Sequence, residues 1–456
     1  MRNGVRSGRP SSTAIFEANR STRLGMNAAS VASSSYTSGM ALDLTATDVR
    51  ARAAGDPWTH AAPYWGAFTA ATHDLPAPVV ALSVEALSRN AHDLLRRAGG
   101  IPIRVASKSV RSRGILDAVL AMPGYEGVLA YTLAEALWLS ESIEDVVVAY
   151  PTADCSALRT LGADETAAHR VTVMIDSTTQ LDLIDASVAP GKRHPIRVCL
   201  DLDASWRAPI LGHIGVRRSA LHRPDQLSAL AAEVVRRPGF TLVGVMAYEA
   251  QIAGVGDRPT PSPGSGAMLR AMQRASSAEL AERRAAAVAA VRAITELEFV
   301  NGGGTGSVER TAAESAITEI AAGSGLYGPH LFDHYAGFEV APAVGFALDV
   351  VRKPTEDRAV LLGGGWIASG PAARDRLPQP VWPAGLNYET REGAGEVQTP
   401  LRGKSARELH PGDRVWLRHT KAGEPMEHTH EIVPLTMDGV ALEGIPTYRG
   451  EGRCFL

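Results

Sequence analysis

The strongest constraint on the fold is a regular alternation of two sequence patterns between residues 77 and 330. Short runs rich in β-branched residues alternate there with longer stretches in which apolar residues recur at helical spacing. This alternation is typical of βα units, which build parallel sheets. The predicted strands are 78–83, 103–107, 127–131, 145–150, 170–175, 196–202, 241–247, 297–301 and 317–321. They exceed by one the eight strands that close a (β/α)8 barrel.

The first predicted strand accounts for the surplus. It precedes an amphipathic stretch with Val84, Leu87, Ala91 and Leu94 on one face. We expect the strand at 78–83 to join another sheet, which leaves eight strands from residue 103 onward for a closed barrel.

The sequence changes in character after about residue 335. Gly, Pro and short apolar or alternating runs such as 347–351 and 414–417 predict an all-β region. The expected fold class is therefore α/β, a TIM-type (β/α)8 barrel with a C-terminal all-β domain. The barrel and its leading segment would span 56–335, and the β-rich domain 336–456.

The N-terminal stretch 1–55 is rich in Ser, Thr, Ala and Arg and poor in large apolar residues. This composition predicts a mostly disordered tail. Two explanations for the tail stay open: a transit peptide, or a true start at Met26 or Met40.

Charge and composition narrow the classes of function. A formal net charge of −3 over 456 residues gives no reason to expect nucleic acid or an anionic membrane as a partner. No apolar run reaches the ~20 residues that a membrane helix needs. Cys155, Cys199 and Cys454 are far apart and odd in number, which suggests neither a disulfide framework nor a thiolate zinc site. We expect a cytoplasmic protein with a small-molecule substrate.

A lysine follows the predicted strand 103–107. In a barrel, Lys108 would lie at the C-terminal rim of the strands, where active sites of this fold are found. Desolvation and neighbouring cations make a lysine amine nucleophilic, so that it can form an imine with an aldehyde cofactor. The alternative is a surface lysine that ends a strand.

A glycine-rich loop, 302–306, follows the predicted strand 297–301 and precedes helical sequence. Successive glycines let backbone N–H groups approach a phosphate closely. A phosphate site late in the barrel is a recurring feature of this fold. We therefore predict a phosphate site here, with a flexible turn as the alternative.

Lys108, the loop 302–306 and the stretch 321–328 together resemble the alanine racemase-like group of pyridoxal-phosphate (PLP) enzymes. A β-rich C-terminal domain with a late His motif is most similar to the D-threonine aldolase and D-serine dehydratase branch. The resemblance spans residues 75 to 456. In that family the extra strand before the lysine strand pairs with the C-terminal sheet, and members commonly form homodimers.

The resemblance implies a set of cofactor contacts. Lys108 would hold PLP as a Schiff base, and Gly303, Gly304 and Thr305 would hold its phosphate. Tyr248 falls where the family has an aromatic residue near the cofactor.

Further candidates come from the same resemblance. Tyr327, within the stretch 321–328, is a candidate cofactor contact. Arg207 and Arg217 are candidates for holding the substrate carboxylate, since an arginine fork suits a carboxylate, or for fixing the cofactor. Each arginine could instead be a solvated strand-end residue, and Tyr248 a half-buried strand tyrosine.

Two departures from the family pattern affect the predicted chemistry. Alanine racemases have an arginine where this chain has Ala321, and the loss of that cation argues against simple racemization. His428 and His430 would point to the same face of a strand and could bind one divalent ion, Zn or Mn. The branch has Asp or Cys in place of His430, so a pair of surface histidines is the alternative.

The resulting expectation is a PLP-dependent lyase, an aldolase or a dehydratase, that acts on D-configured β-hydroxy amino acids such as D-threonine or D-serine. An amino-acid racemase or epimerase and a non-catalytic PLP carrier are the alternative functions.

Overall fold

A computed structural model describes residues 42–258, 263–371, 373–421 and 423–456. The first 41 residues of the predicted tail lie outside the described residues. Within the described part, α1 (Thr47–Ala53) is a helix that buries Val49 and Ala53. It packs on α3 (Val84–Ala98), and Arg52 pairs with Glu85 at 2.6 Å. The prediction of disorder up to residue 55 was therefore wrong for this helix, because two small apolar residues suffice to dock it.

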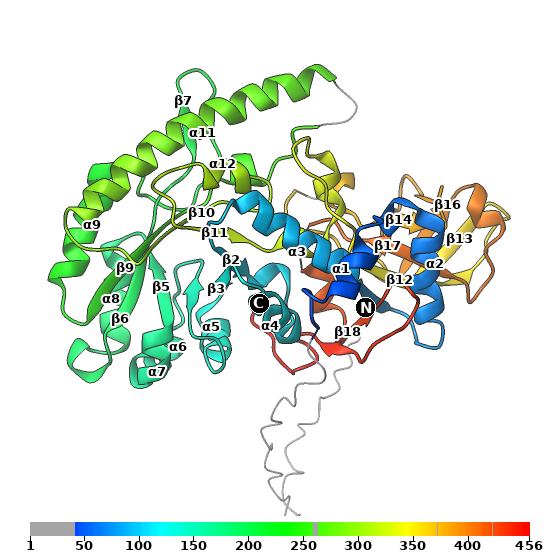
Figure 1. The fold of residues 1–456 in the computed structure, drawn as a ribbon, viewed down its shortest axis with the longest axis horizontal. Coiled ribbons are helices and arrows are strands. Elements are labelled where there is room, and N and C mark those ends of the chain that lie inside the picture. The colour runs from blue at the N-terminus through cyan, green and yellow to red at the C-terminus, as the bar shows by residue number, and fades with distance from the viewer. Residues whose placement is uncertain (1–41, 259–262, 372, 422) are drawn as a thin grey trace, which may run out of the picture. The chain divides into compact units, whose positions relative to one another are not determined.

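Eight parallel strands close the predicted barrel (Figure 1). In order around the barrel they are β2 (Ile103–Ala106), β3 (Tyr125–Ala130), β4 (Val146–Val148), β5 (Val171–Ile175), β6 (Ile196–Asp201), β9 (Phe240–Ala247), β10 (Phe299–Gly302) and β11 (Glu319–Ala322). Each corresponds to one predicted strand, so the predicted fold class is confirmed. A separate hairpin, β7 (Trp206–Ala208) and β8 (Gly212–Ile214), extends between β6 and β9.

The helices of the barrel follow its strands. They are α4 (Arg113–Leu120), α5 (Leu133–Leu139), α6 (Cys155–Ala163), α7 (Glu165–Arg170), α8 (Thr178–Ser187), α9 (Pro224–Arg236), α10 (Ala250–Ala253), α11 (Pro263–Arg292), α12 (Val308–Ala312) and α13 (Ser324–Tyr327). Helix α3 precedes β2. It begins where the Ser83 hydroxyl accepts from the Ala86 N–H, and it ends at Gly99, whose positive φ favours glycine.

The surplus strand, β1 (Val79–Ser83), belongs to a second, nine-stranded sheet, as expected. It pairs antiparallel with β12 and parallel with β18. The other strands are β12 (Val344–Arg352), β13 (Arg358–Leu362), β14 (Gln379–Trp382), β15 (Asn387–Tyr388), β16 (Gln398–Arg402), β17 (Arg414–Arg418), β18 (Glu431–Leu435) and β19 (Ile445–Pro446). Segments from both ends of the chain therefore build this sheet, and the blue and red ribbons of Figure 1 lie together.

Helix α2 (Ala61–Ala71) covers this sheet with aromatic side chains. Trp65 stacks on Trp416 of β17 with ring centroids 5.9 Å apart, and Phe68 meets the same indole edge-on at 5.2 Å. The Trp416 Nε1 donates to Thr69 Oγ1 at 2.9 Å, so the buried indole N–H is satisfied. This cluster attaches the N-terminal segment to the C-terminal sheet.

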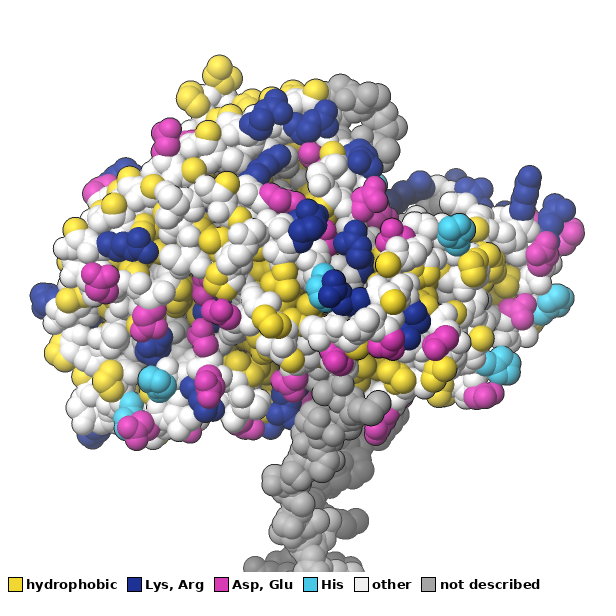
Figure 2. Space-filling view, in the orientation of Figure 1, with side chains coloured by type: hydrophobic (Ala, Val, Ile, Leu, Met, Phe, Trp, Pro, Cys, Tyr) yellow, Lys and Arg dark blue, Asp and Glu magenta, His cyan; other side chains and the backbone are white. Residues whose placement is uncertain are grey.

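The described surface mixes both signs of charge. Figure 2 shows acidic and basic side chains interspersed on the face in view. A search of the described helices finds none with the length and apolar character needed to cross a membrane.

The Trp416 cluster leads to a stability prediction. Trp416→Ala removes a fully buried indole and leaves a cavity, so we expect the free energy of unfolding to fall by about 3–5 kcal/mol in a denaturant titration. Val397→Ala, at a side chain that is 62% exposed, is the matched control and should change it by less than about 0.5 kcal/mol. Equal losses in the two variants would contradict this account.

Candidate active site

A cavity of about 290 Å³ lies at the C-terminal ends of the barrel strands. This is the rim where (β/α)8 enzymes carry their active sites. Its lining combines Lys108, Tyr248, Asn301, Gly303, Gly304, Thr305, Gly323 and Ser324 with Arg218, Lys421 and apolar residues that include Ala106, Met246, Ala321 and Phe332. The structure thus brings five of the predicted site residues, Lys108, Tyr248, Gly303, Gly304 and Thr305, to one cavity.

Lys108 lies on a short 3-10 turn, Ser107–Ser109, that directly follows β2. The Ser107 hydroxyl donates to the Leu129 carbonyl at 3.1 Å, which ties the turn to the neighbouring strand β3. Arg111 has a φ of +53°, and its Nε donates to the Lys108 carbonyl at 3.0 Å. A non-glycine residue in that left-handed region is strained, so surrounding contacts must hold it. One such contact is Arg111 Nη1 to Glu427 Oε1, at 2.5 Å.

The glycine-rich loop is hydrogen-bonded to Glu249, a residue that the sequence did not single out. The Glu249 carboxylate accepts from the Gly303 N–H at 3.2 Å, from the Ser307 hydroxyl at 3.0 Å and from the Thr311 hydroxyl. Arg284 of α11 donates to it at 2.8 Å, with both side chains buried. These four contacts brace the loop.

The same contacts decide which loop groups are left for an anion. The Gly303 amide donates to the Glu249 carboxylate, away from the cavity. The Gly304 amide is also used within the loop, since it donates to Ser307 Oγ at 3.2 Å. Thr305 and Ser324 line the cavity as well, and both carry hydroxyl groups. A side chain at Gly304 would meet Tyr248 Cε2 at 3.2 Å, so glycine permits the close approach of ring and backbone.

Arg218 lines the cavity, although the sequence pointed to its neighbour Arg217. Its guanidinium lies 5.6 Å from the ring centroid of Tyr150 and 5.9 Å from that of Tyr248. Burial, and then the charge of Glu249, raise the pKa of Tyr248 to about 12, so this phenol stays protonated at neutral pH.

Lys421 reaches the cavity from the loop after β17, and nothing in the local sequence pointed to it. The loop is close to the Lys108 turn, since a side chain at Gly423 would meet the Lys108 carbonyl. Burial, followed by the charges of Arg376 and Lys108, lowers the pKa of Lys421 below its ordinary value. A second amine therefore faces the cavity beside Lys108.

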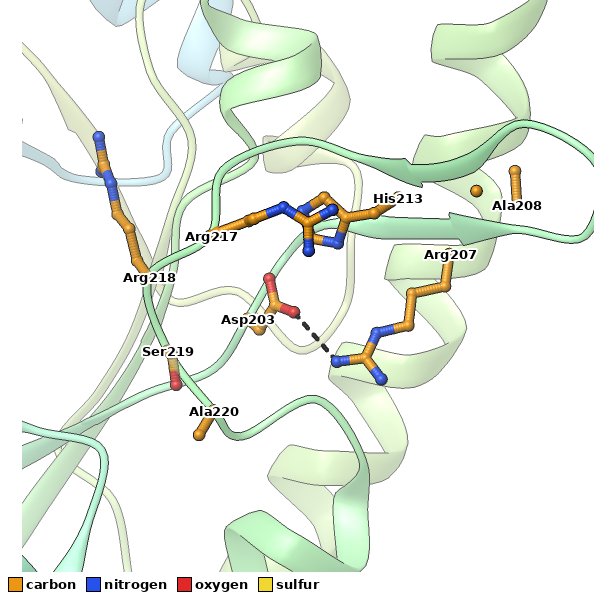
Figure 3. Close-up of a pocket in the computed structure, with 9 residues that line it drawn as sticks. Asp203, Arg207, Ala208, His213, Arg217, Arg218, Ser219 and Ala220 are labelled. Carbon is orange, nitrogen blue, oxygen red and sulfur yellow. Dashed lines mark ion pairs between the residues drawn. The ribbon is translucent and has the colours of Figure 1, made fainter.

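The other five predicted site residues, Tyr327, Arg207, Arg217, His428 and His430, lie outside the cavity lining. Tyr327 is fully buried, and its hydroxyl donates to the Val110 carbonyl at 2.9 Å, where it supports the segment after Lys108. Arg207 and Arg217 line a separate hollow beside the β7–β8 hairpin (Figure 3).

The predicted strand through His428 and His430 was wrong. Residues Glu424–Glu427 form a 3-10 turn, and β18 begins only at Glu431. His428 stacks on Trp366 with centroids 4.8 Å apart, while His430 Nδ1 lies 3.4 Å from the Arg449 carbonyl oxygen. Pro425 in the preceding turn breaks the strand pattern. Within the described ranges, no group of three or more His, Cys, Asp or Glu side chains is placed to hold a metal ion.

Comparison with known proteins identifies the family. The family model described as alanine racemase, N-terminal domain, matches residues 82–330, which is more than half of the chain. The chain belongs to this family.

The individual relatives share only a small part of their sequence with this chain. A D-threonine aldolase from Arthrobacter sp. is 26% identical over 326 residues, which cover 70% of this chain and 77% of the relative. The fold is similar to that of a D-threonine aldolase from Filomicrobium marinum, with a TM-score of 0.69 at 20% identity, covering 83% of this chain and 96% of the other. It is also similar to D-threo-3-hydroxyaspartate dehydratase from Delftia sp. HT23, with a TM-score of 0.62 at 18% identity, covering 82% and 97%.

The part that matches the alanine racemase N-terminal domain family contains the whole barrel and ends at His330, before β12 and the later strands of the second sheet. Lys108 and the glycine loop lie inside it, whereas Lys421 lies beyond it. Inside it, Ala321 lines the cavity and pairs in register with Arg104 of β2. Arg104 Nε donates to Glu319 Oε1 at 2.7 Å within the barrel.

A buried acid next to the Lys108 turn gives a pH prediction. Glu135 accepts from the Tyr131 N–H at 2.7 Å and from the Tyr448 hydroxyl at 2.9 Å, and burial raises its pKa from 4.5 to about 7. Between these values the folded protein retains a proton that the unfolded chain releases, so this contribution to the free energy of unfolding is lost as pH rises.

The test is Glu135→Gln in denaturant titrations at several pH values. The variant should lose a pH dependence of about 3 kcal/mol at most between pH 4.5 and about 7. Glu141→Gln, at an exposed residue of the same region, is the control and should keep the wild-type slope. A Glu135→Gln slope equal to that of the wild type would contradict the assignment.

Proposed function

We propose that the protein is a PLP-dependent lyase acting on D-configured β-hydroxy amino acids such as D-threonine or D-serine. The observation that carries the proposal is that Lys108 and the glycine loop share one cavity. Family membership and the names of the relatives, two D-threonine aldolases and a dehydratase of a D-hydroxy amino acid, support the same class of reaction.

The residues of the cavity fit PLP. Lys108 offers an amine for covalent attachment of the aldehyde, while Thr305 and Ser324 offer hydroxyl groups to the phosphate. Tyr248 packs against Gly304, and its aromatic ring forms part of the cavity wall. When bound, PLP withdraws electrons from the Cα of an amino acid attached to it.

This chain's own residues would then bind the substrate and move protons. Arg218 presents a guanidinium at the cavity wall, where it can hold the substrate carboxylate. We assign the proton of the β-hydroxyl to Lys421, because its lowered pKa leaves more of the uncharged amine near neutral pH. A divalent metal at His428 and His430 stays a prediction, as do the homodimer and the cytoplasmic location.

The attachment of PLP is tested by absorbance. The purified protein, incubated with PLP, should show the band of the lysine-bound cofactor, and Lys108→Ala should abolish it because the only amine assigned to the aldehyde is gone. Lys192→Ala removes an exposed lysine elsewhere and should leave the band intact. An unchanged band in Lys108→Ala would overturn the proposal.

The reaction is tested by incubation with D- and L-serine, threonine and alanine, with and without a divalent metal. Ammonia or an aldehyde formed from the D-β-hydroxy amino acids supports a lyase. Inversion alone would indicate the alternative racemase, and no reaction of any substrate would indicate a PLP carrier.

The role of Lys421 predicts a specific kinetic change. Lys421→Met should lower kcat by about 10²-fold, the usual contribution of a general base. It should also remove the rise of kcat with pH, because the wild-type amine becomes a base only as it loses its proton. Lys404→Met, at an exposed lysine of the same sheet region, is the control. A pH profile unchanged in Lys421→Met would exclude this role.

A further inference from the structure

The hollow that contains Arg207 and Arg217 has features of a binding site of its own. Its volume is about 660 Å³, within the usual range for small-molecule pockets. It is lined by Asp203, Arg207, Ala208, Gly212, His213, Arg217, Arg218, Ser219 and Ala220. Figure 3 shows Asp203 between the side chains of Arg217 and His213 on one side and the guanidinium of Arg207 on the other.

Positive charge dominates this hollow. Three arginines face one carboxylate, that of Asp203. This carboxylate already accepts from the Ser205 N–H at 2.9 Å and the Ser205 hydroxyl at 2.8 Å, and Arg207 approaches it only to 3.7 Å. Among the described residues, neither Arg217 nor Arg218 has an ion pair with a carboxylate within 4 Å. The hollow therefore has arginine hydrogen-bond donors left for an anion.

Another acid in the same region carries less negative charge than usual near neutral pH. Asp201 lines a smaller hollow with Arg218, and burial, followed by the charge of Asp176, raises the pKa of Asp201 to about 7. The raised pKa leaves a larger share of this carboxyl group protonated near neutral pH, which reduces its ability to neutralise Arg218.

The hollow is continuous in its lining with the proposed active site. Arg218 lines both the outer hollow and the Lys108 cavity. The smaller hollow between them is lined by Asp203 and Ser219 of the outer hollow and by Tyr150 and Tyr248 of the cavity. An anion in the outer hollow could therefore contact the same guanidinium that lines the cavity.

We infer that the outer hollow is a second binding site for small carboxylates, which the incoming amino-acid substrate occupies before it enters the cavity. Guanidinium groups bind carboxylates through paired, charge-assisted hydrogen bonds. This role as an entrance site rests on the proposed function, whereas carboxylate binding does not. A site on the path of entry raises kcat/KM and leaves kcat unchanged, because it acts before the chemical step.

The binding test uses succinate, a dicarboxylate with no amine that could react with PLP. Calorimetry on the PLP-loaded protein should show binding that weakens with added salt, and no binding of the neutral succinamide. Arg217→Gln should weaken succinate binding by about tenfold, as expected when one charge-assisted contact is lost. Arg236→Gln removes the same charge from an exposed residue of α9 and should leave the binding unchanged.

Each outcome separates the inference from its alternatives. Equal affinities in Arg217→Gln and the wild type would overturn it, as would equal losses in Arg217→Gln and Arg236→Gln, which indicate a general effect of surface charge. A loss in Lys421→Met without a loss in Arg217→Gln would place succinate in the Lys108 cavity and also overturn it. Competition by inorganic phosphate that exceeds that of succinate would make phosphate the preferred anion and overturn the carboxylate assignment.

Kinetics then test the entrance role. With a substrate found in the incubation series, Arg217→Gln and Arg207→Gln should lower kcat/KM by about tenfold with kcat unchanged. A lower kcat instead would overturn the entrance role. If no substrate reacts at all, the proposed function fails, and the succinate titration still decides whether the outer site exists.

Discussion

Closure of the barrel is the constraint on which the site depends. Strand β11 pairs with β2 on one side, with Ala322 opposite Val105, and with β10 on the other, with Ile320 opposite Gly302. Because the strands are parallel, their C-terminal ends meet at one rim. The Lys108 turn and the glycine loop are about 200 residues apart in sequence, yet they follow strands that are separated in the barrel only by β11.

The rim is made rigid by buried ionic groups. Glu249 and Arg284 form a pair with almost no solvent exposure, and Glu314 adds a second partner to the arginine at 2.8 Å. Burying charged groups costs free energy. This cost is offset only when nearly all hydrogen-bond donors and acceptors of the buried groups have partners. Glu249 meets this condition, since backbone, two hydroxyls and a guanidinium all donate to it. These contacts fix the glycine loop to the barrel beneath it.

The C-terminal segment completes the site from the other side. The Arg111–Glu427 contact and the hydrogen bond from the Tyr448 N–H to the Arg111 carbonyl attach this segment to the turn that carries Lys108. The same region brings Lys421 to the cavity. Deleting the second sheet would therefore change the environment of Lys108 and remove Lys421 from the cavity, which makes the two parts one functional unit.

The sequence alone determined the features that are local in the chain. Hydrophobic periodicity located all eight barrel strands and the surplus strand, because each strand is buried over its own few residues. Lys108 and the glycine loop were found because each directly follows a strand. Which of the adjacent residues Arg217 and Arg218 faces the cavity was decided only by tertiary structure, since neighbouring side chains in extended backbone point in different directions (Figure 3). Glu249 and Lys421 were likewise invisible in the sequence, because their partners are distant in the chain and meet them only when the barrel and the second sheet pack together.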